Sequence, residues 1–237
     1  MTTLVIKLLL VIGAIDAQVP TQDLQHAQEK HLRNIRQLTF GGTNAEAYFS
    51  FDQKRLVFQS ARDPYRCDQI FLMNVDGSNQ TLMSTGNGTT TCGFFFPDGR
   101  KLLYASTHRE RAECYPRPDK SKGYVWGVWN AYDLYTVGVD GKNPTILSAS
   151  KGYDAEATIS PTGDKIVFTS TRDGDLDLYS SNLDGSQVQR ITNDLGYDGG
   201  AFFSWDGKRI VYRAYHPKDS AETAEYTSLL ADQLVKP

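Results

Sequence analysis

The sequence lacks the signatures of several large protein classes. Its 237 residues include three cysteines and no Cys-x-x-Cys pair, which disfavours a thiolate zinc site. Lysine and arginine total 25 against 28 aspartates and glutamates, so the net charge of −3 leaves no basic stripe to neutralise a run of phosphates. The composition therefore argues against a nucleic-acid partner.

Motifs for nucleophilic catalysis and phosphate binding are also missing. The chain has no Gly-x-Ser-x-Gly nucleophile elbow and no alternation of strands with helices of the α/β-hydrolase kind. No glycine-rich loop opens a helix, since Gly199-Gly200 precedes a predicted strand. These absences favour a non-catalytic protein.

Long apolar runs are absent too. Residues 8–12 are apolar, follow Lys7 and lead to a small residue at Ala17, which predicts a signal peptide over 1–17. The run is too short to span a bilayer, so an integral membrane protein is not expected; an ordinary buried helix or strand is the alternative. Residues 18–32 are interpreted as a linker or helix. The three cysteines are Cys67, Cys92 and Cys114. In an oxidising compartment they permit one disulfide and leave one thiol, and the sequence does not decide which two pair.

What the sequence has instead is a repeat. A five-residue block starts at positions 50, 96, 160 and 204, so the spacings are 46, 64 and 44 residues. It reads Ser-Phe-Asp-Gln-Lys, Phe-Pro-Asp-Gly-Arg, Ser-Pro-Thr-Gly-Asp and Ser-Trp-Asp-Gly-Lys. An alternating apolar strand follows each block. In three repeats a second strand then runs into an Asp-Gly turn, at Asp76, Asp140 and Asp184, which is a strong hairpin signal.

One strand before each block and one after each Asp-Gly turn bring the repeat to four antiparallel strands. Four strands at a period near 45 residues are typical of a propeller blade. The sequence thus predicts an all-β chain, a β-propeller of four-stranded antiparallel blades over 33–237, with blades at about 44–84, 90–148, 154–192 and 198–237. The last repeat stops after two strands and continues into helical spacing over 220–235 behind Asp219. Three full blades, part of a fourth and a short C-terminal helix are expected.

The third repeat carries a family resemblance. The string at 160–179 (Ser-Pro-Thr-Gly-Asp-Lys-Ile-Val-Phe-Thr-Ser-Thr-Arg-Asp-Gly-Asp-Leu-Asp-Leu-Tyr), followed by Asn-Leu-Asp-Gly-Ser at 182–186, resembles the repeat of TolB-like (WD-repeat-like) propellers. The likeness extends over about residues 33–216. It implies a ring of usually six blades and partners of the cell-envelope kind, but no particular chemistry, because such propellers host unrelated functions.

The resemblance also bears on the two ends of the predicted propeller. Residues 36–39 match the outer strand of a blade and are expected to close the ring with the last blade. Because fewer than six blades are present, the chain is interpreted as part of a longer protein; self-association through open blade edges is the alternative.

Equivalent positions of the repeats predict a polar face where the inner strands line the axis. Six residues before each block stand Asn44, Thr90, Asp154 and Asp198, and four before it stand Glu46, Cys92, Glu156 and Gly200. Since Ca²⁺ takes oxygen ligands, Asp154, Glu156 and Asp198 are candidate ligands. The alternative is that both aspartates cap turns. No other metal or cofactor is expected.

A second set of equivalent positions opens the loop after the second strand: Arg62, His108, Arg172 and His216. Because Asp63 and Asp173 follow the arginines, ion pairs between these neighbours are expected, while the histidines could bind metal or act as bases. His108 to Asn130 forms an insertion in the second repeat that contains two tryptophans. It is interpreted as a recognition loop or as a lid on its own blade.

Together these observations predict an exported, periplasmic or secreted, non-catalytic module that binds a protein, peptide or envelope polymer through its axial face. The candidates on that face are Glu46, His108, Tyr124, Trp126, Trp129, Asp154, Glu156, Asp198 and His216. Two alternatives stay open. One is the regulatory propeller of a larger peptidase whose catalytic domain lies beyond Pro237; the other is a metal-dependent polysaccharide lyase or hydrolase.

Overall fold

A computed structural model describes residues 26–119, 121 and 123–237. The predicted signal peptide, residues 1–17, lies outside this part of the chain. Residues 26–38 belong to a separate unit and contain turns and coil but no helix, so this part of the predicted linker or helix is not helical. Residues 39–237 form the second unit.

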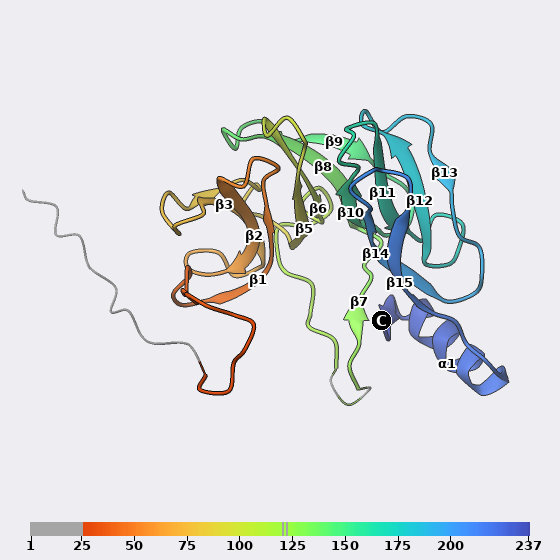
Figure 1. Cartoon of the computed structure of the whole chain (residues 1–237). Coiled ribbons are helices and arrows are strands. Elements are labelled where there is room, and N and C mark those ends of the chain that lie inside the picture. The colour runs from red at the N-terminus through yellow and green to blue at the C-terminus, as the bar shows by residue number, and fades with distance from the viewer. Residues whose placement is uncertain (1–25, 120, 122) are drawn as a thin grey trace, which may run out of the picture. The chain divides into compact units, whose positions relative to one another are not determined.

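The second unit consists of antiparallel sheets that follow one another along the chain (Figure 1). The first sheet has the order β1 (Thr43–Phe49), β2 (Arg55–Ala61), β3 (Gln69–Asn74), β4 (Thr81–Leu82). The second has the order β5 (Thr90–Phe95), β6 (Lys101–Ser106), β8 (Asp133–Gly138), β9 (Thr145–Ser148). The third has the order β10 (Asp154–Ile159), β11 (Lys165–Ser170), β12 (Asp177–Asn182), β13 (Gln189–Arg190). The fourth contains β14 (Tyr197–Phe203) and β15 (Ile210–Tyr215). The predicted fold class, with four-stranded antiparallel sheets, is confirmed.

The Asp-Gly turns occupy equivalent environments, as a repeat requires. Asp76 and Asp184 each accept a hydrogen bond from the backbone N–H two residues on, at 2.9 Å, and Asp140 accepts the same bond at 3.2 Å. The glycine after each aspartate has a positive φ of 88°, 69° or 79°, a conformation that costs glycine nothing. The turn sequence therefore fixes the hairpin between the third and fourth strands.

The core lies between successive sheets. Val57 and Ile70 of the first sheet pack with Leu102 of the second, in a cluster that also includes Tyr104, Tyr135 and Val137. Leu103 and Leu134, on the other face of the second sheet, pack with Phe168 of the third. Burial of each such side chain contributes about 1.5–3 kcal/mol, so every sheet depends on its neighbour for stability.

The insertion and the C-terminal segment are joined by a short two-stranded sheet. Asp219 caps helix α1 (Ser220–Ala231) by accepting from the N–H groups of Ala221 and Glu222, which confirms the predicted helix. The chain then forms β16 (Leu234–Val235), which pairs with β7 (Trp126–Gly127) of the insertion. None of the described helices is long and apolar enough to cross a membrane.

The predicted outer strand at residues 36–39 is not a strand in the structure. An outer strand needs a third strand as its hydrogen-bonding neighbour, as β13 has β12. The fourth sheet offers no such neighbour, since it contains β14 and β15 in the described part of the chain.

Candidate functional site

Each inner strand contains one bulge at the same place. The pairing of β1 with β2 shifts between Ala45 and Tyr48, so one extra residue is inserted there, and β5, β10 and β14 show the same shift. The first residue inside each bulge has a positive φ of 50°, 54°, 56° and 60° at Glu46, Cys92, Glu156 and Gly200. A bulge bends the strand and redirects the side chain that it carries.

The bulges converge on one hollow of about 290 Å³. All four inner strands contribute to its lining, and the four bulge residues are among its walls. Glu46 and Glu156, two of the candidate binding residues, therefore lie in the wall of the same hollow. Aromatic rings make up much of the remaining surface: Tyr48, Phe94, Trp126, Tyr197 and Phe202.

Aromatic contacts bring the first and last inner strands together. The ring centroids of Tyr48 and Phe202 lie 5.6 Å apart, and Phe94 lies 5.7 Å from Tyr48 and 6.1 Å from Phe202. Aromatic pairs at this separation contribute about 0.5–1.5 kcal/mol beyond their buried area. These rings therefore hold β1 and β14 in place around the hollow.

Glu156 is a fixed, buried acceptor in this hollow. Tyr153 Oη donates to its Oε1 at 2.9 Å, and Tyr197 Oη and Gly200 N both donate to its Oε2 at 2.7 Å. Burial raises the pKa of Glu156 above its ordinary value, while these three donors oppose the rise. Three hydrogen bonds thus fix the position of the carboxyl group.

Cys92 carries the remaining thiol. Its pKa is raised well above its ordinary value, first by burial and then by the negative charges of Glu46 and Glu156. The structure joins Cys67 to Cys114, which settles the pairing that the sequence left open. Cys92 lines the hollow, and because the thiolate is the reactive form, its raised pKa disfavours nucleophilic attack.

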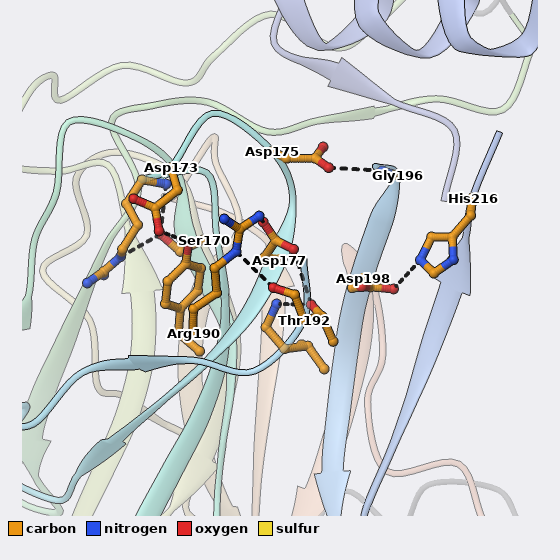
Figure 2. Close-up of polar contacts among 12 residues, drawn as sticks. Ser170, Asp173, Asp175, Asp177, Arg190, Thr192, Gly196, Asp198 and His216 are labelled. Carbon is orange, nitrogen blue, oxygen red and sulfur yellow. Dashed lines mark hydrogen bonds and ion pairs between the residues drawn. The ribbon is translucent and has the colours of Figure 1, made fainter. Parts of the chain in front are cut away.

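Asp154 and Asp198 lie away from this hollow and have side-chain partners. Asp154 accepts from Ser170 Oγ at 2.5 Å and from Arg172 Nη2 at 3.0 Å. His216, which follows β15, contacts Asp198 of β14 with 3.0 Å between His216 Nε2 and Asp198 Oδ1. Figure 2 marks this contact between the two side chains. The turn-capping interpretation places backbone amides next to both aspartates. The structure places side chains there instead: Ser170 and Arg172 at Asp154, and His216 at Asp198.

The predicted ion pairs between each arginine and the aspartate that follows it are also wrong, because the arginines have other partners. Arg172 pairs across the sheet with Asp154, while Asp173 accepts from Tyr179 Oη at 2.6 Å. Arg62 donates to Asn44 Oδ1 at 2.7 Å. The strand pairing explains this, because it places the start of the inner strand beside the end of the second strand.

The three candidate calcium ligands do not converge. Glu156 lines the hollow, whereas Asp154 and Asp198 are each committed to a cationic or imidazole side chain. Within the described residues, no group of three or more His, Cys, Asp or Glu side chains is arranged to hold a metal ion. The calcium site stays a prediction.

The insertion contributes to two surfaces. Trp126 lines the axial hollow, and Trp129 stacks on Tyr115 with centroids 4.8 Å apart beside a second hollow. Tyr124 is exposed, and His108 packs on Tyr135 at 4.4 Å. The disulfide anchors the insertion to the loop between β2 and β3, so it packs on its own and the preceding blade while reaching the hollow.

Comparison with known proteins finds propellers, as the repeat predicts. Residues 129–229 match the family described as "TolB beta propeller domain". The putative TolB from Agrobacterium tumefaciens is similar at 24% identity and a TM-score of 0.57, covering 71% of this chain and 53% of that one. TolB from Acinetobacter baumannii is similar at 17% identity and a TM-score of 0.58, covering 75% and 39%.

A third similar structure is an oligogalacturonate lyase in complex with manganese, at 15% identity and a TM-score of 0.56, covering 77% of this chain and 50% of that one. The chain thus spans about half or less of the length of these structures. Likeness at such identities shows the fold. With the family match at residues 129–229, it confirms the resemblance to TolB-type propellers that the sequence predicts.

Proposed function

We propose that this set of TolB-like propeller blades is an exported, non-catalytic binding module that takes a peptide or polymer segment in its axial hollow. The observation that carries the proposal is the convergence of four equivalent bulge positions on one cavity. Their side chains differ while the backbone repeats: Glu46, Cys92, Glu156 and Gly200. A surface with a constant frame and variable side chains is suited to recognition.

The chemistry of the hollow fits a segment with an apolar or basic side chain. A volume of about 290 Å³ accommodates one or two side chains and lies near the lower end of ligand pockets. Aromatic walls offer apolar contact, and the charged groups of the lining are the two carboxyl groups of Glu46 and Glu156 and the one guanidinium of Arg213. The carboxyl groups lie close to Cys92, whose pKa is raised first by burial and then by Glu46 and Glu156.

Export is supported by the disulfide between Cys67 and Cys114, since disulfides persist in oxidising compartments. A cell-envelope or extracellular location follows as part of the proposal. Fractionation of the source cells, with thiol labelling of the fractions, tests it. An oxidised pair in the extracytoplasmic fraction supports export, and a reduced pair confined to the cytoplasm contradicts it.

The binding proposal is tested by a peptide-display selection on the purified chain, followed by fluorescence anisotropy of the selected peptides. Glu46→Lys places a cation in the hollow, so we expect the affinity for basic peptides to fall about tenfold or more. The matched control is Glu113→Lys, an exposed position of the insertion. Peptides that respond to the control and ignore Glu46→Lys would place binding elsewhere.

One further assay distinguishes the binding proposal from the alternative of a metal-dependent lyase. The purified chain is loaded with Mn²⁺ or Ca²⁺ and incubated with uronic-acid polymers. Production of unsaturated sugars, sensitive to Glu156→Gln, would replace the binding proposal with an enzymatic one. We expect no turnover, because the candidate ligands Asp154 and Asp198 are held by Arg172 and His216.

A further inference from the structure

The second hollow, also of about 290 Å³, is lined by the loop between β2 and β3 and by the insertion. The loop contributes Arg66 and Asp68, and the insertion contributes Tyr115, Arg117 and Trp129. Its described lining lies within residues 61–132 and includes no residue of the fourth sheet. The hollow is therefore built by the first two repeats alone.

The disulfide brings the charged side chains of this hollow together. Cys67 stands between Arg66 and Asp68 in the sequence, and Cys114 lies three residues before Arg117. The Cα atoms of the two cysteines are 5.3 Å apart. Arg117 also lies between two prolines, whose φ angles are fixed by their rings. The backbone that carries the three charges is therefore restrained before a ligand arrives, which lowers the entropy cost of binding.

An aromatic stack closes one side of the hollow. The rings of Trp129 and Tyr115 are stacked with centroids 4.8 Å apart and planes inclined by 13°. A Cβ atom at Gly127 would lie 2.5 Å from the Trp129 ring, so the glycine allows the indole to lie against the backbone. This wall offers apolar contact to a ligand, while the remaining groups of the hollow are polar.

Two of these polar groups have no hydrogen-bonding partner among the described residues. Tyr132 is 6% exposed and lines the hollow, yet its hydroxyl makes no such bond, and neither does the half-buried carboxyl group of Asp68. Burial raises the pKa of Asp68, and Arg117 opposes the rise. The pKa of Tyr132 is raised first by burial and then by Cys92 and Asp68, so the hydroxyl and the carboxyl group lie within electrostatic range. Since buried polar groups normally have partners, these oxygens are open to a ligand.

Two guanidinium groups complete the lining. Arg66 and Arg117 are exposed, and neither makes an ion pair or a side-chain hydrogen bond with a described residue. Together with Asp68 they are the charged side chains of the described lining, which gives two positive charges and one negative charge. The axial hollow has the opposite excess, so the two hollows suit different ligands.

We propose that the second hollow binds a free acidic α-amino acid, aspartate or glutamate. The ammonium group of such a ligand has three N–H donors, and the hollow offers it three acceptors: the two carboxyl oxygens of Asp68 and the hydroxyl oxygen of Tyr132. The two carboxylates of the ligand pair with the guanidiniums of Arg66 and Arg117 in charge-assisted hydrogen bonds. All three charges of the described lining are then neutralised.

Other small ligands leave part of this lining without a partner. An inorganic anion would engage the two guanidiniums but has no donor for Asp68 and Tyr132. A neutral amino acid would pair with Asp68 and with one arginine, and the second arginine would keep its charge uncompensated. The acidic amino acid is the class that satisfies each of these groups.

The test is isothermal titration calorimetry of the whole oxidised protein with L-glutamate and L-aspartate. We expect at least one of them to bind with a stoichiometry of one. N-Acetyl-L-glutamate, which lacks the ammonium group, and L-glutamine, which lacks the second carboxylate, should each bind at least tenfold more weakly.

Protein variants locate the site. Asp68→Asn and Arg117→Gln should each weaken the binding of the amino acid at least tenfold, and Tyr132→Phe, which removes the hydroxyl and keeps the ring, should weaken it about tenfold. Arg100→Gln is the matched control, because Arg100 is exposed in the turn before β6 and outside the lining of the hollow. Far-UV circular dichroism and thermal unfolding check that each variant is folded.

Three results would overturn the proposal. Absence of binding at millimolar concentrations of both amino acids would show that water alone satisfies the open oxygens. Equal binding of N-acetyl-L-glutamate would show that the arginines hold an anion without help from Asp68. An affinity that responds to Glu46→Lys and not to Asp68→Asn would place the amino acid in the axial hollow.

Discussion

Replacement of Arg172 by leucine should reveal what a buried charge costs when its partner is removed. Asp154 is fully buried, and Arg172 Nη2 reaches its Oδ1 at 3.0 Å while the guanidinium lies over Phe168 and Tyr179. Arg172→Leu keeps much of the apolar contact with the two rings. It leaves the carboxylate without its cation.

The expected loss is about 3 kcal/mol in the free energy of unfolding. Removing one member of a buried ion pair costs about 3–5 kcal/mol, and Ser170 Oγ still donates to Asp154, which favours the lower end. The first sheet provides a natural control, because Asn44 takes the place of Asp154 and accepts from Arg62 at 2.7 Å. Arg62→Leu leaves no buried charge and should cost about 1–2 kcal/mol.

Urea unfolding followed by tryptophan fluorescence measures these differences. Asp154→Asn imitates the first sheet and should cost about 1 kcal/mol; in that background the further cost of Arg172→Leu should fall to about 1 kcal/mol. An equal cost of Arg172→Leu in both backgrounds would refute the reasoning, since it would show that the charge of Asp154 plays no part.

Three further predictions concern the cysteines and the hollow. Replacing Cys67 and Cys114 by serine removes a crosslink over 47 residues and should lower the free energy of unfolding by about 4 kcal/mol, measured by urea unfolding against the oxidised protein. Cys92, whose pKa is raised by burial, should react with a maleimide slowly in the native protein and rapidly in urea; rapid native labelling would contradict its placement. Glu156 has a folded pKa above its ordinary value of 4.5, so the folded state binds this proton more tightly than the unfolded state does. Its contribution to stability should fall as the pH rises from about 4.5 through the folded pKa. Glu156→Gln should flatten that part of the stability profile, and an unchanged slope would argue against a shifted carboxyl group.

The blades could be predicted from sequence because their signals are local. The Asp-Gly turns at Asp76, Asp140 and Asp184 depend on two adjacent residues, and the strands around them alternate with period two. The C-terminal helix was equally accessible through its Asp219 cap. Each of these features is decided within one hairpin or one helical turn.

Features that depend on register could not be read in the same way. The partner of Arg172 is 18 residues away in the sequence, and it becomes a neighbour through the pairing of β10 with β11. The bulges at Glu46 and Glu156 shift that register by one residue, and nothing in those residue types signals a positive φ. One signal was available, because Gly200 occupies the fourth equivalent position and glycine favours such a backbone.

Disulfide pairing and the contact of β7 with β16 depend on longer-range geometry still. Cys67 and Cys114 lie in loops of successive repeats, and their approach follows from how the insertion crosses the preceding sheet. Leu234 and Gly127 meet only because α1 returns the chain to the insertion. The periodicity of the sequence does not predict the disulfide or the pairing of β7 with β16.

The repeated inner-strand bulge makes the lining of the hollow replaceable one residue at a time. Its four left-handed positions are set by strand pairing. Glu46, Cys92 and Gly200 lie outside the apolar clusters between sheets, whereas Glu156 accepts hydrogen bonds from Tyr153 and Tyr197 of one cluster. Asparagine, aspartate and glycine adopt this backbone at least cost. A designer seeking a new specificity would begin with a library at residues 46, 92 and 200 and leave Glu156 and the rest of the frame intact.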